Sequence, residues 1–290
     1  MLDLAAELGL ASIELAAGNW STAPHLDVRR LLNDSHEAAR LLAAVESRGM
    51  TISALNASGN PLHPVHGQAL DAKTRDVMRL AGELGVGTVV LMSGLPAGAP
   101  GDSMPNWVTT SWPPETTVMR DYQWGIVLDY WSDLTRFAET TGITRLAVEM
   151  HANQVVFSVP GVQRLRETFG PLIGANLDPS HLMWMGADPL AAVDALAGAI
   201  YHVHAKDTRI ENRVRVRSVM DPLTVAHVEE RAWNFVTVGR GHPVKWWTEF
   251  VRRLDASGYA GALSIEHEDA EVDGVAGVRE AASVLQRALS

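Results

Sequence analysis

Four ionisable residues stand near the ends of four separate apolar segments of this 290-residue chain. They are Glu149 in RLAVEMH, Asp178 in IGANLDP, His204 in IYHVHAKD and Glu266 in ALSIEHED. An ionisable side chain in an apolar segment is costly to bury unless it is paired or bound to a metal. One of the four could belong to a structural ion pair, but the same placement in four segments favours a shared site.

Three carboxylates and one imidazole form a donor set that is rich in oxygen. The sequence therefore predicts one divalent metal ion, bound by Glu149, Asp178, His204 and Glu266. Such donors suit Mn²⁺, which we expect first, and Mg²⁺ or Co²⁺, while Zn²⁺ also binds them. The chain has no cysteine, which excludes thiolate zinc sites, disulfides and Cys nucleophiles.

Other polar and aromatic residues lie close to these four in the sequence. His181 follows Asp178 in LDPSH, and Lys206 and Asp207 follow His204 in HAKD. We expect Asp207 to orient an imidazole, because a histidine that binds metal usually needs a hydrogen-bond acceptor for its other nitrogen. A Pro-, Gly- and Trp-rich stretch from residue 95 to about 114 has the composition of a lid over a site. We predict that the substrate contacts His181, Lys206, His63 and Trp112.

Strand and helix patterns alternate along the whole chain. Strands are predicted at 11–16, 51–59, 87–94, 145–151, 173–179, 200–207 and 262–269. Helices are predicted at 35–49, 67–85, 115–141, 160–168, 189–199, 242–258 and 275–290, and the stretch between 207 and 242 reads as irregular. Strands that are nearly continuously apolar are typical of a parallel sheet covered by helices on its faces.

These elements favour an α/β fold of the (β/α)₈ TIM-barrel type, in one domain over residues 1–290. No GxGxxG follows the first strand and no GxxxxGK[ST] occurs. The absence of these motifs argues against a dinucleotide-binding fold and a P-loop fold. Only seven strands are predicted, and the helical LDLAAELG precedes the first of them. We therefore expect the barrel to lack its first strand in this chain, through a start site placed too late. Active sites of such barrels lie at the C-terminal ends of the strands.

Charge and hydropathy restrict the partners of the protein. The 24 Lys and Arg residues are outnumbered by 34 Asp and Glu, giving a formal net charge of −10, which argues against nucleic acid. No apolar run is long enough for a membrane helix, and the acidic N-terminus does not resemble a signal peptide. We expect a cytoplasmic protein with a small carbohydrate substrate and leave a homo-oligomer open. The basic run at 209–217 is either a solvated loop or a contact with an anionic substrate group.

The chain resembles the xylose-isomerase-like barrel superfamily, in its sugar phosphate isomerase/epimerase branch, over essentially its whole length. The motifs that carry the resemblance are GNPLHP (59–64), SGLP (93–96), PNW and SWPPE (105–115), YQW (122–124), EMH (149–151), LDPSH (177–181), HVHAKD (202–207), TVGRGH (237–242) and SIEHED (264–269). Ketose 3-epimerases and inosose dehydratase are relatives within it. There a divalent metal is held by Glu, Asp, His and Glu, which fall here on Glu149, Asp178, His204 and Glu266. The resemblance also implies a substrate contact for His181 and, with a different spacing from the ligating His, for Arg209.

Three activities are compatible with such a site. The first is a metal-dependent isomerase or epimerase of a sugar or polyol, in which an enediolate forms and Glu149 and Glu266 exchange protons with its two faces. The second is a lyase or dehydratase of the same site, acting on a keto-inositol or a 3-keto-glycoside. The third is a DNA-repair phosphodiesterase with the same barrel. The acidic charge and the lack of a DxH pair after HAKD argue against it. A barrel that binds without catalysis is the remaining reading.

Overall fold

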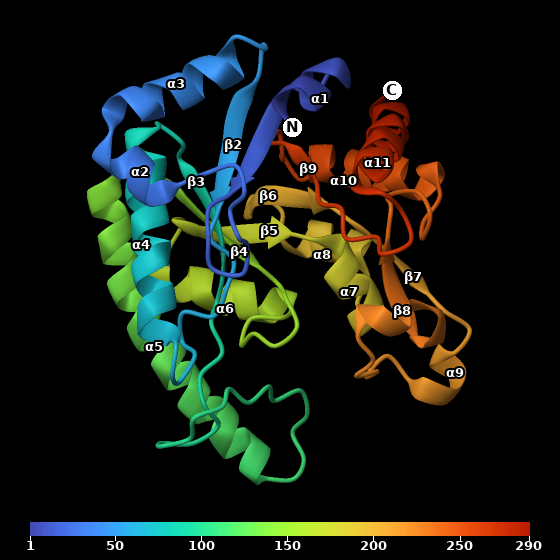
Figure 1. Ribbon diagram of the computed structural model, residues 1–290. Helices are drawn as coiled ribbons and strands as arrows, with labels where there is room; N and C mark the ends of the chain where they lie inside the picture. The colour runs from blue at the N-terminus through green and yellow to red at the C-terminus, as the bar shows by residue number, and fades with distance from the viewer. The chain divides into compact units, whose positions relative to one another are not determined.

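The computed structural model describes residues 1–290, and the chain divides into two compact units, Met1–Asn176 and Leu177–Ser290. Figure 1 labels the elements of both.

Five strands of the first unit pair in parallel, in the order in which they occur along the chain. They are β1 (Ser12–Ala16), β2 (Thr51–Asn56), β3 (Thr88–Met92), β4 (Arg145–Glu149) and β5 (Ile173–Leu177), whose last residue begins the second unit. β3 and β5 are buried along their whole length, as their nearly continuous apolar sequence predicts. The register places Glu149, the last residue of β4, beside Met92 and Asn176.

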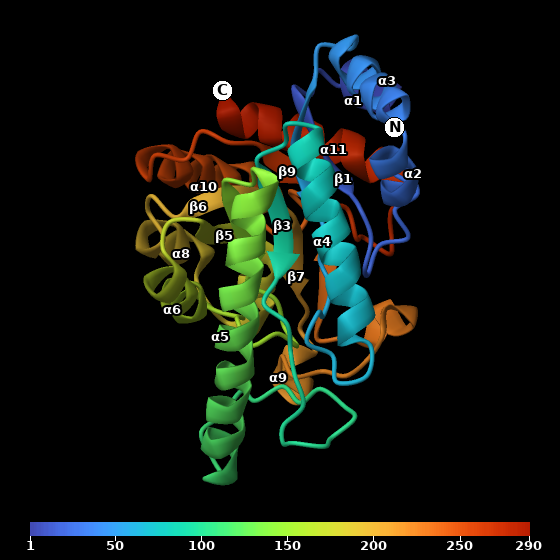
Figure 2. The ribbon, with the colours of Figure 1, turned by 90° about the vertical axis from the view of Figure 1, so that its left-hand side faces the viewer.

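Six helices belong to the first unit: α1 (Leu2–Glu7), α2 (Val28–Asn33), α3 (Ser35–Glu46), α4 (Gly67–Glu83), α5 (Glu115–Thr141) and α6 (Val159–Phe169). α4 and α5 lie side by side against the strands (Figures 1 and 2). Asp34 begins α3 by accepting hydrogen bonds from the backbone of His36 and Glu37. α5 ends at Gly142, whose φ of 76° is readily adopted by glycine.

The core of the first unit forms where helix α5 packs on the sheet. Trp131 is completely buried, and its indole nitrogen donates a hydrogen bond of 3.1 Å to the carbonyl oxygen of Ser93. Ser93 follows β3 directly, so this bond fixes the end of the strand against the helix. The stretch that was predicted to be a lid begins at this point and runs to the start of α5.

The second unit contains two separate pairs of strands. β6 (Ile200–Ala205) and β9 (Leu263–Ile265) are parallel, whereas β7 (Asp207–Ile210) and β8 (Trp233–Val236) form an antiparallel hairpin. The other elements are α7 (Pro179–Met185), α8 (Pro189–Ala195), α9 (Val214–Arg217), the 3₁₀ helix η1 (Val225–Glu230), α10 (Val244–Ala256) and α11 (Gly274–Leu289). α10 packs on both α8 and α11.

The hairpin corrects the prediction that the chain is irregular between 207 and 242. The predicted strand at 200–207 is interrupted at Lys206, and the chain resumes as β7 with an antiparallel partner. The signal is weak in the sequence because the two hairpin strands are only four residues long and are joined by a segment rich in arginine. The hairpin places Phe235 beside two residues of the predicted site, as described below.

The number of parallel strands agrees with the prediction. Five occur in the first unit and two in the second, so seven of the eight strands of a complete barrel are present in residues 1–290. β1 pairs with β2 alone, and β9 pairs with β6 alone. No strand formed by residues 1–290 therefore occupies the place of the predicted missing one.

Candidate metal centre

Three of the four predicted metal ligands lie together in the second unit. Asp178, His204 and Glu266 each offer one ligand atom, and these atoms lie within 4.8 Å of one another. Asp178 and His204 are almost completely buried, whereas 32% of the Glu266 side chain is exposed. Nδ1 of His204 is 2.8 Å from Oε2 of Glu266. The arrangement thus has a buried floor and one carboxylate that solvent can reach.

The local sequence explains how each of these ligands is positioned. Asp178 follows β5 and is the N-cap of α7, where its Oδ1 accepts a hydrogen bond of 2.8 Å from the backbone of Ser180. His204 pairs with Ser264 across the parallel strands β6 and β9, and Glu266 follows β9 directly. The backbone nitrogen of Glu266 donates to the carbonyl oxygen of Ala205, so the pairing continues to the ligand itself.

Two basic residues predicted to contact substrate lie beside these ligands. Nζ of Lys206 is 3.9 Å from Oδ2 of Asp178 and 3.5 Å from Oε1 of Glu266. Nε2 of His181 is 3.3 Å from Oδ2 of Asp178. Both side chains also contact the ring of Phe235: Lys206 Nζ is 4.3 Å from its centroid, and His181 meets it edge to face. The structure therefore brings His181 and Lys206 to the ligand cluster.

The charges of this cluster fit a divalent cation. Lys206 makes its shortest ion pair, of 2.8 Å, with Glu268, so three carboxylates surround one ammonium group. With Asp178, Glu266 and Glu268 ionised and Lys206 protonated, three negative charges and one positive charge leave −2. Asp178 is buried, while 32% of the Glu266 side chain and 49% of the Glu268 side chain are exposed. The buried charge of Asp178 needs compensation, which a divalent ion bound by carboxylate oxygen and imidazole nitrogen would provide.

Glu149, the fourth predicted ligand, lies in the first unit at the end of β4. Its side chain is buried, with 2% of the residue exposed, and Oγ of Ser58 is 3.5 Å from its Oε2. It occupies the C-terminal end of a parallel strand, as the sequence analysis expects of a barrel ligand. Its part in metal binding stays a prediction.

The structure gives His63 and Trp112 different surroundings in the same unit. Nδ1 of His63 accepts hydrogen bonds from the backbone nitrogens of Val65 and His66, which shapes the turn before α4. Trp112 is 76% exposed in the stretch between β3 and α5. His63 thus has a local structural task, and Trp112 presents its indole to solvent. Substrate contact remains a prediction for both.

Arg209, the remaining predicted substrate contact, is paired with two carboxylates. Its guanidinium donates to Glu211 at 2.7 Å and to Glu271 at 2.8 Å. The hydrogen bond to Glu271, followed by the one to Glu211, raises the pKa of Arg209 above its ordinary value, against the opposing effect of burial. The structure therefore shows Arg209 joining β7 to two acidic residues, and its role toward a substrate stays a prediction.

Asp207 has a different partner from the one expected. Its buried carboxylate lies against the loop 239–242, where it accepts from the backbone nitrogens of Gly239, Gly241 and His242. Nδ1 of His242 is 2.7 Å from Oδ1 of Asp207. The acidic residue beside His204 thus fastens this loop, while the carboxylate 2.8 Å from His204 belongs to Glu266.

Substitution of Asp207 should therefore lower the stability of the second unit. We expect Asp207→Ala to lower the free energy of unfolding by about 2–4 kcal/mol, because several backbone donors lose their acceptor. Urea denaturation followed by circular dichroism measures this change. The exposed Asp255→Ala on α10 should change it by less than about 0.5 kcal/mol. Equal effects of both substitutions would contradict the role assigned to Asp207.

The sequence analysis missed two residues that contact the cluster. Glu268 alternates with Glu266 in SIEHED, so the strand period could have placed it on the same side of the chain. Phe235 had no comparable signal, because the hairpin that carries it was not predicted.

Comparison with known proteins identifies the family. The sequence model of the family described as "Xylose isomerase-like TIM barrel" matches residues 2–288. A Bacillus subtilis (strain 168) protein, "Uncharacterized protein YfiH", is 43% identical over 295 residues, covering 100% of this chain and 94% of that protein. An inosose dehydratase of Geobacillus thermodenitrificans is 28% identical over 154 residues, which is 52% of this chain and 49% of the dehydratase.

Solved structures with low sequence identity show the same fold. The probable 3-DHS dehydratase AsbF of Bacillus anthracis has a TM-score of 0.69 at 16% identity, covering 98% of this chain and 92% of that one. D-psicose 3-epimerase of Clostridium cellulolyticum H10 has a TM-score of 0.64 at 15% identity, covering 99% and 91%. IolI with a bound zinc atom also gives 0.64, at 17% identity, covering 99% and 90%.

The chain belongs to the xylose isomerase-like TIM barrel family. The barrel class predicted from the alternating elements and the resemblance to this superfamily are both confirmed. The proteins to which this chain is similar include an epimerase and dehydratases, which fits an enzyme. None of its helices is long and apolar enough to cross a membrane.

Proposed function

We propose that this protein is a divalent-metal-dependent isomerase or epimerase of a sugar or polyol. The observation that carries the proposal is the convergence of the Asp178, His204 and Glu266 ligand atoms within 4.8 Å. A buried carboxylate, a partly exposed one and a buried imidazole at the C-terminal ends of parallel strands suit metal-assisted chemistry on a small substrate. The ion is proposed as Mn²⁺, with Mg²⁺, Co²⁺ and Zn²⁺ as alternatives that the same donors accept.

The proposal makes Glu149 the fourth ligand and, with Glu266, one of two proton-transferring carboxylates. It rests on the place of Glu149 at the end of β4, because the strand ends of a barrel face one common site. When bound, the ion would supply the positive charge that stabilises a negatively charged substrate oxygen.

In this proposal, two glutamate side chains of the protein carry out the proton transfers. One glutamate removes the proton from the substrate carbon beside the carbonyl, and the other returns a proton to the opposite face, which inverts the centre. Lys206 and His181 would hold the substrate oxygens, since both reach the ligand cluster. The ammonium group of Lys206 donates charge-assisted hydrogen bonds. These bonds become stronger as the substrate oxygen gains negative charge during the reaction.

A lyase or dehydratase of the same site is the second candidate, acting on a keto-inositol or a 3-keto-glycoside. The similarity to an inosose dehydratase over about half of the chain favours it. Both reactions begin with removal of a proton beside a carbonyl. They differ in whether a group on the neighbouring carbon then leaves.

Deuterium exchange distinguishes the two candidates. Ketohexoses, keto-inositols and 3-keto-glucosides are incubated with the Mn²⁺-loaded protein in D₂O and followed by proton NMR. An isomerase or epimerase gives carbon-bound deuterium in recovered or inverted sugar. A lyase gives loss of water or of the aglycone. No exchange and no elimination with any of these substrates would contradict both candidates.

A further inference from the structure

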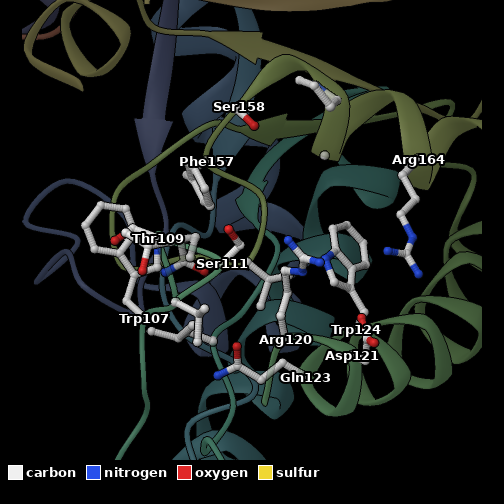
Figure 3. A pocket seen from close by; sticks show the side chains of 17 residues that line it. Trp107, Thr109, Ser111, Arg120, Asp121, Gln123, Trp124, Phe157, Ser158 and Arg164 are labelled. Atoms are coloured by element: carbon white, nitrogen blue, oxygen red, sulfur yellow. The ribbon is translucent and has the colours of Figure 1, made fainter. Parts of the chain in front are cut away.

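A cavity in the first unit lies between the stretch that follows β3, the start of α5 and the segment around the start of α6. Its volume is about 360 Å³, within the range of pockets that hold small ligands. Figure 3 shows Trp107 and Phe157 on one side and Arg120 and Trp124 on the other, with Arg164 beyond the Trp124 ring. Every residue that lines it belongs to the first unit, whereas Asp178, His204 and Glu266 belong to the second.

The wall of this cavity contains a buried amide whose donor end has no hydrogen-bond partner. Gln154 is completely buried, and its Oε1 accepts a hydrogen bond of 2.8 Å from the backbone nitrogen of Gly94. A backbone N–H requires an oxygen, so this bond fixes which end of the amide is the nitrogen. Nε2 of Gln154 is left without an acceptor in the protein. Buried donors are almost always satisfied, so the exception points to an acceptor supplied from outside the chain.

A second donor without an acceptor lines the same cavity. Nε1 of Trp107 is buried and makes no hydrogen bond, while its ring meets that of Phe157 edge to face at 5.6 Å. The stretch that carries Trp107 is held by α5, because Nε2 of Gln123 donates to the carbonyl oxygens of Pro96, Ala97 and Asn106. The indole is thus positioned by a fixed backbone.

Two guanidinium groups complete the donors. The Arg164 guanidinium carbon lies over the Trp124 ring, 4.1 Å from its centroid, so the indole restrains this cationic group. Neither Arg164 nor Arg120 makes an ion pair with another residue. Asp121 is the acidic residue in the lining, so two cationic groups stand against one carboxylate.

We propose that this cavity binds a small organic oxyanion, a carboxylate or phosphate group carried on a flat ring. The oxyanion would accept hydrogen bonds from Nε1 of Trp107, Nε2 of Gln154 and the guanidinium groups. Each of these nitrogens can donate a hydrogen bond but cannot accept one. The ring would pack on the apolar lining, which includes Phe157 and Trp107. The inference is independent of the metal-dependent reaction.

Calorimetric titration of the whole protein with three ring compounds tests the proposal. Benzoate supplies a carboxylate, phenyl phosphate supplies a phosphate, and benzyl alcohol is the neutral control. We expect at least one of the two anions to bind, at least tenfold more tightly than benzyl alcohol. The tighter anion identifies the group that the cavity prefers. If neither anion binds, or if benzyl alcohol binds equally well, the proposal is wrong.

Two conservative variants then locate the binding. Trp107→Phe keeps the aromatic ring and removes its N–H, and Arg120→Gln removes a guanidinium. Each should weaken binding of the preferred anion about tenfold, the effect of losing one hydrogen bond to a charged group. Trp246→Phe on α10 and Arg136→Gln on α5 are the matched controls and should change affinity less than twofold. Equal affinities of the variants and the controls would place the anion elsewhere and overturn the assignment.

Discussion

Replacing either proposed proton-transferring glutamate by glutamine should slow exchange of the substrate carbon-bound hydrogen with D₂O. We expect Glu266→Gln and Glu149→Gln each to lower the rate about 10²–10⁴-fold, the usual contribution of a positioned acid or base. An amide keeps the shape of the side chain and its oxygen but cannot accept the proton. The initial rate of deuterium incorporation, followed by NMR with the substrate found to be turned over, measures the effect.

The two glutamates need not behave identically in this test. Each variant should lose exchange on the face that its glutamate serves and should also lose net inversion, so exchange is measured from each epimer separately, together with inversion. Glu249→Gln is the matched control, because Glu249 pairs with Arg252 and Arg253 on α10 and not with the ligand cluster. If both glutamine variants retain metal and turn over at the wild-type rate, the two-carboxylate mechanism is wrong. His181 and Lys206 would then be the bases to test.

Removal of the buried imidazole should abolish tight metal binding. We expect His204→Ala to lower the affinity for Mn²⁺ at least ~100-fold. Loss of a residue that only hydrogen-bonds to a metal ligand usually has a smaller effect. The variant keeps Asp178 and Glu266 but loses one of three donors that lie within 4.8 Å of one another. Metal titration, with metal content measured by mass spectrometry after gel filtration, gives the affinity and the stoichiometry.

A control histidine separates this effect from a general loss of stability. His227 lies exposed in η1, with Glu230 as its partner at 3.8 Å, so His227→Ala should leave metal content unchanged. Circular dichroism of both variants reports the fold. An unchanged stoichiometry in a folded His204→Ala protein would contradict the assignment of this ligand.

Much of the fold could be predicted because its strands and helices differ strongly in periodicity. The buried strands β3 and β5 are nearly continuous apolar runs, and α5 begins and ends at the residues predicted for it. The hairpin β7–β8 could not be predicted in the same way. Its strands pair with each other through backbone hydrogen bonds between residues about 25 positions apart, which no local pattern records.

The candidate metal centre was predictable for a related reason. Asp178, His204 and Glu266 are charged or polar residues at the ends of apolar strands, where burial without a partner is costly. The contacts around these ligands were harder to predict from the sequence, because they depend on the directions in which the side chains point. Lys206 pairs with Glu268 and lies on Phe235, and Asp207 lies against His242 instead of His204.

The cavity in the first unit could not be predicted from the sequence. Gln154 and Trp107 are ordinary residues in a loop and in a predicted lid, and only the structure shows that their donors have no acceptor. Arg120 and Arg164 lie on helices that are separated by a strand. Their convergence on one cavity is therefore a property of the packing and not of their spacing.

The metal dependence of carbon-bound hydrogen exchange tests the central claim most directly. The purified protein is stripped with EDTA, dialysed, and assayed for deuterium incorporation from D₂O before and after addition of one equivalent of Mn²⁺. We predict that exchange is lost on stripping and returns with the ion, while circular dichroism shows the same fold throughout. Exchange that continues at the original rate in metal-free protein would contradict the account.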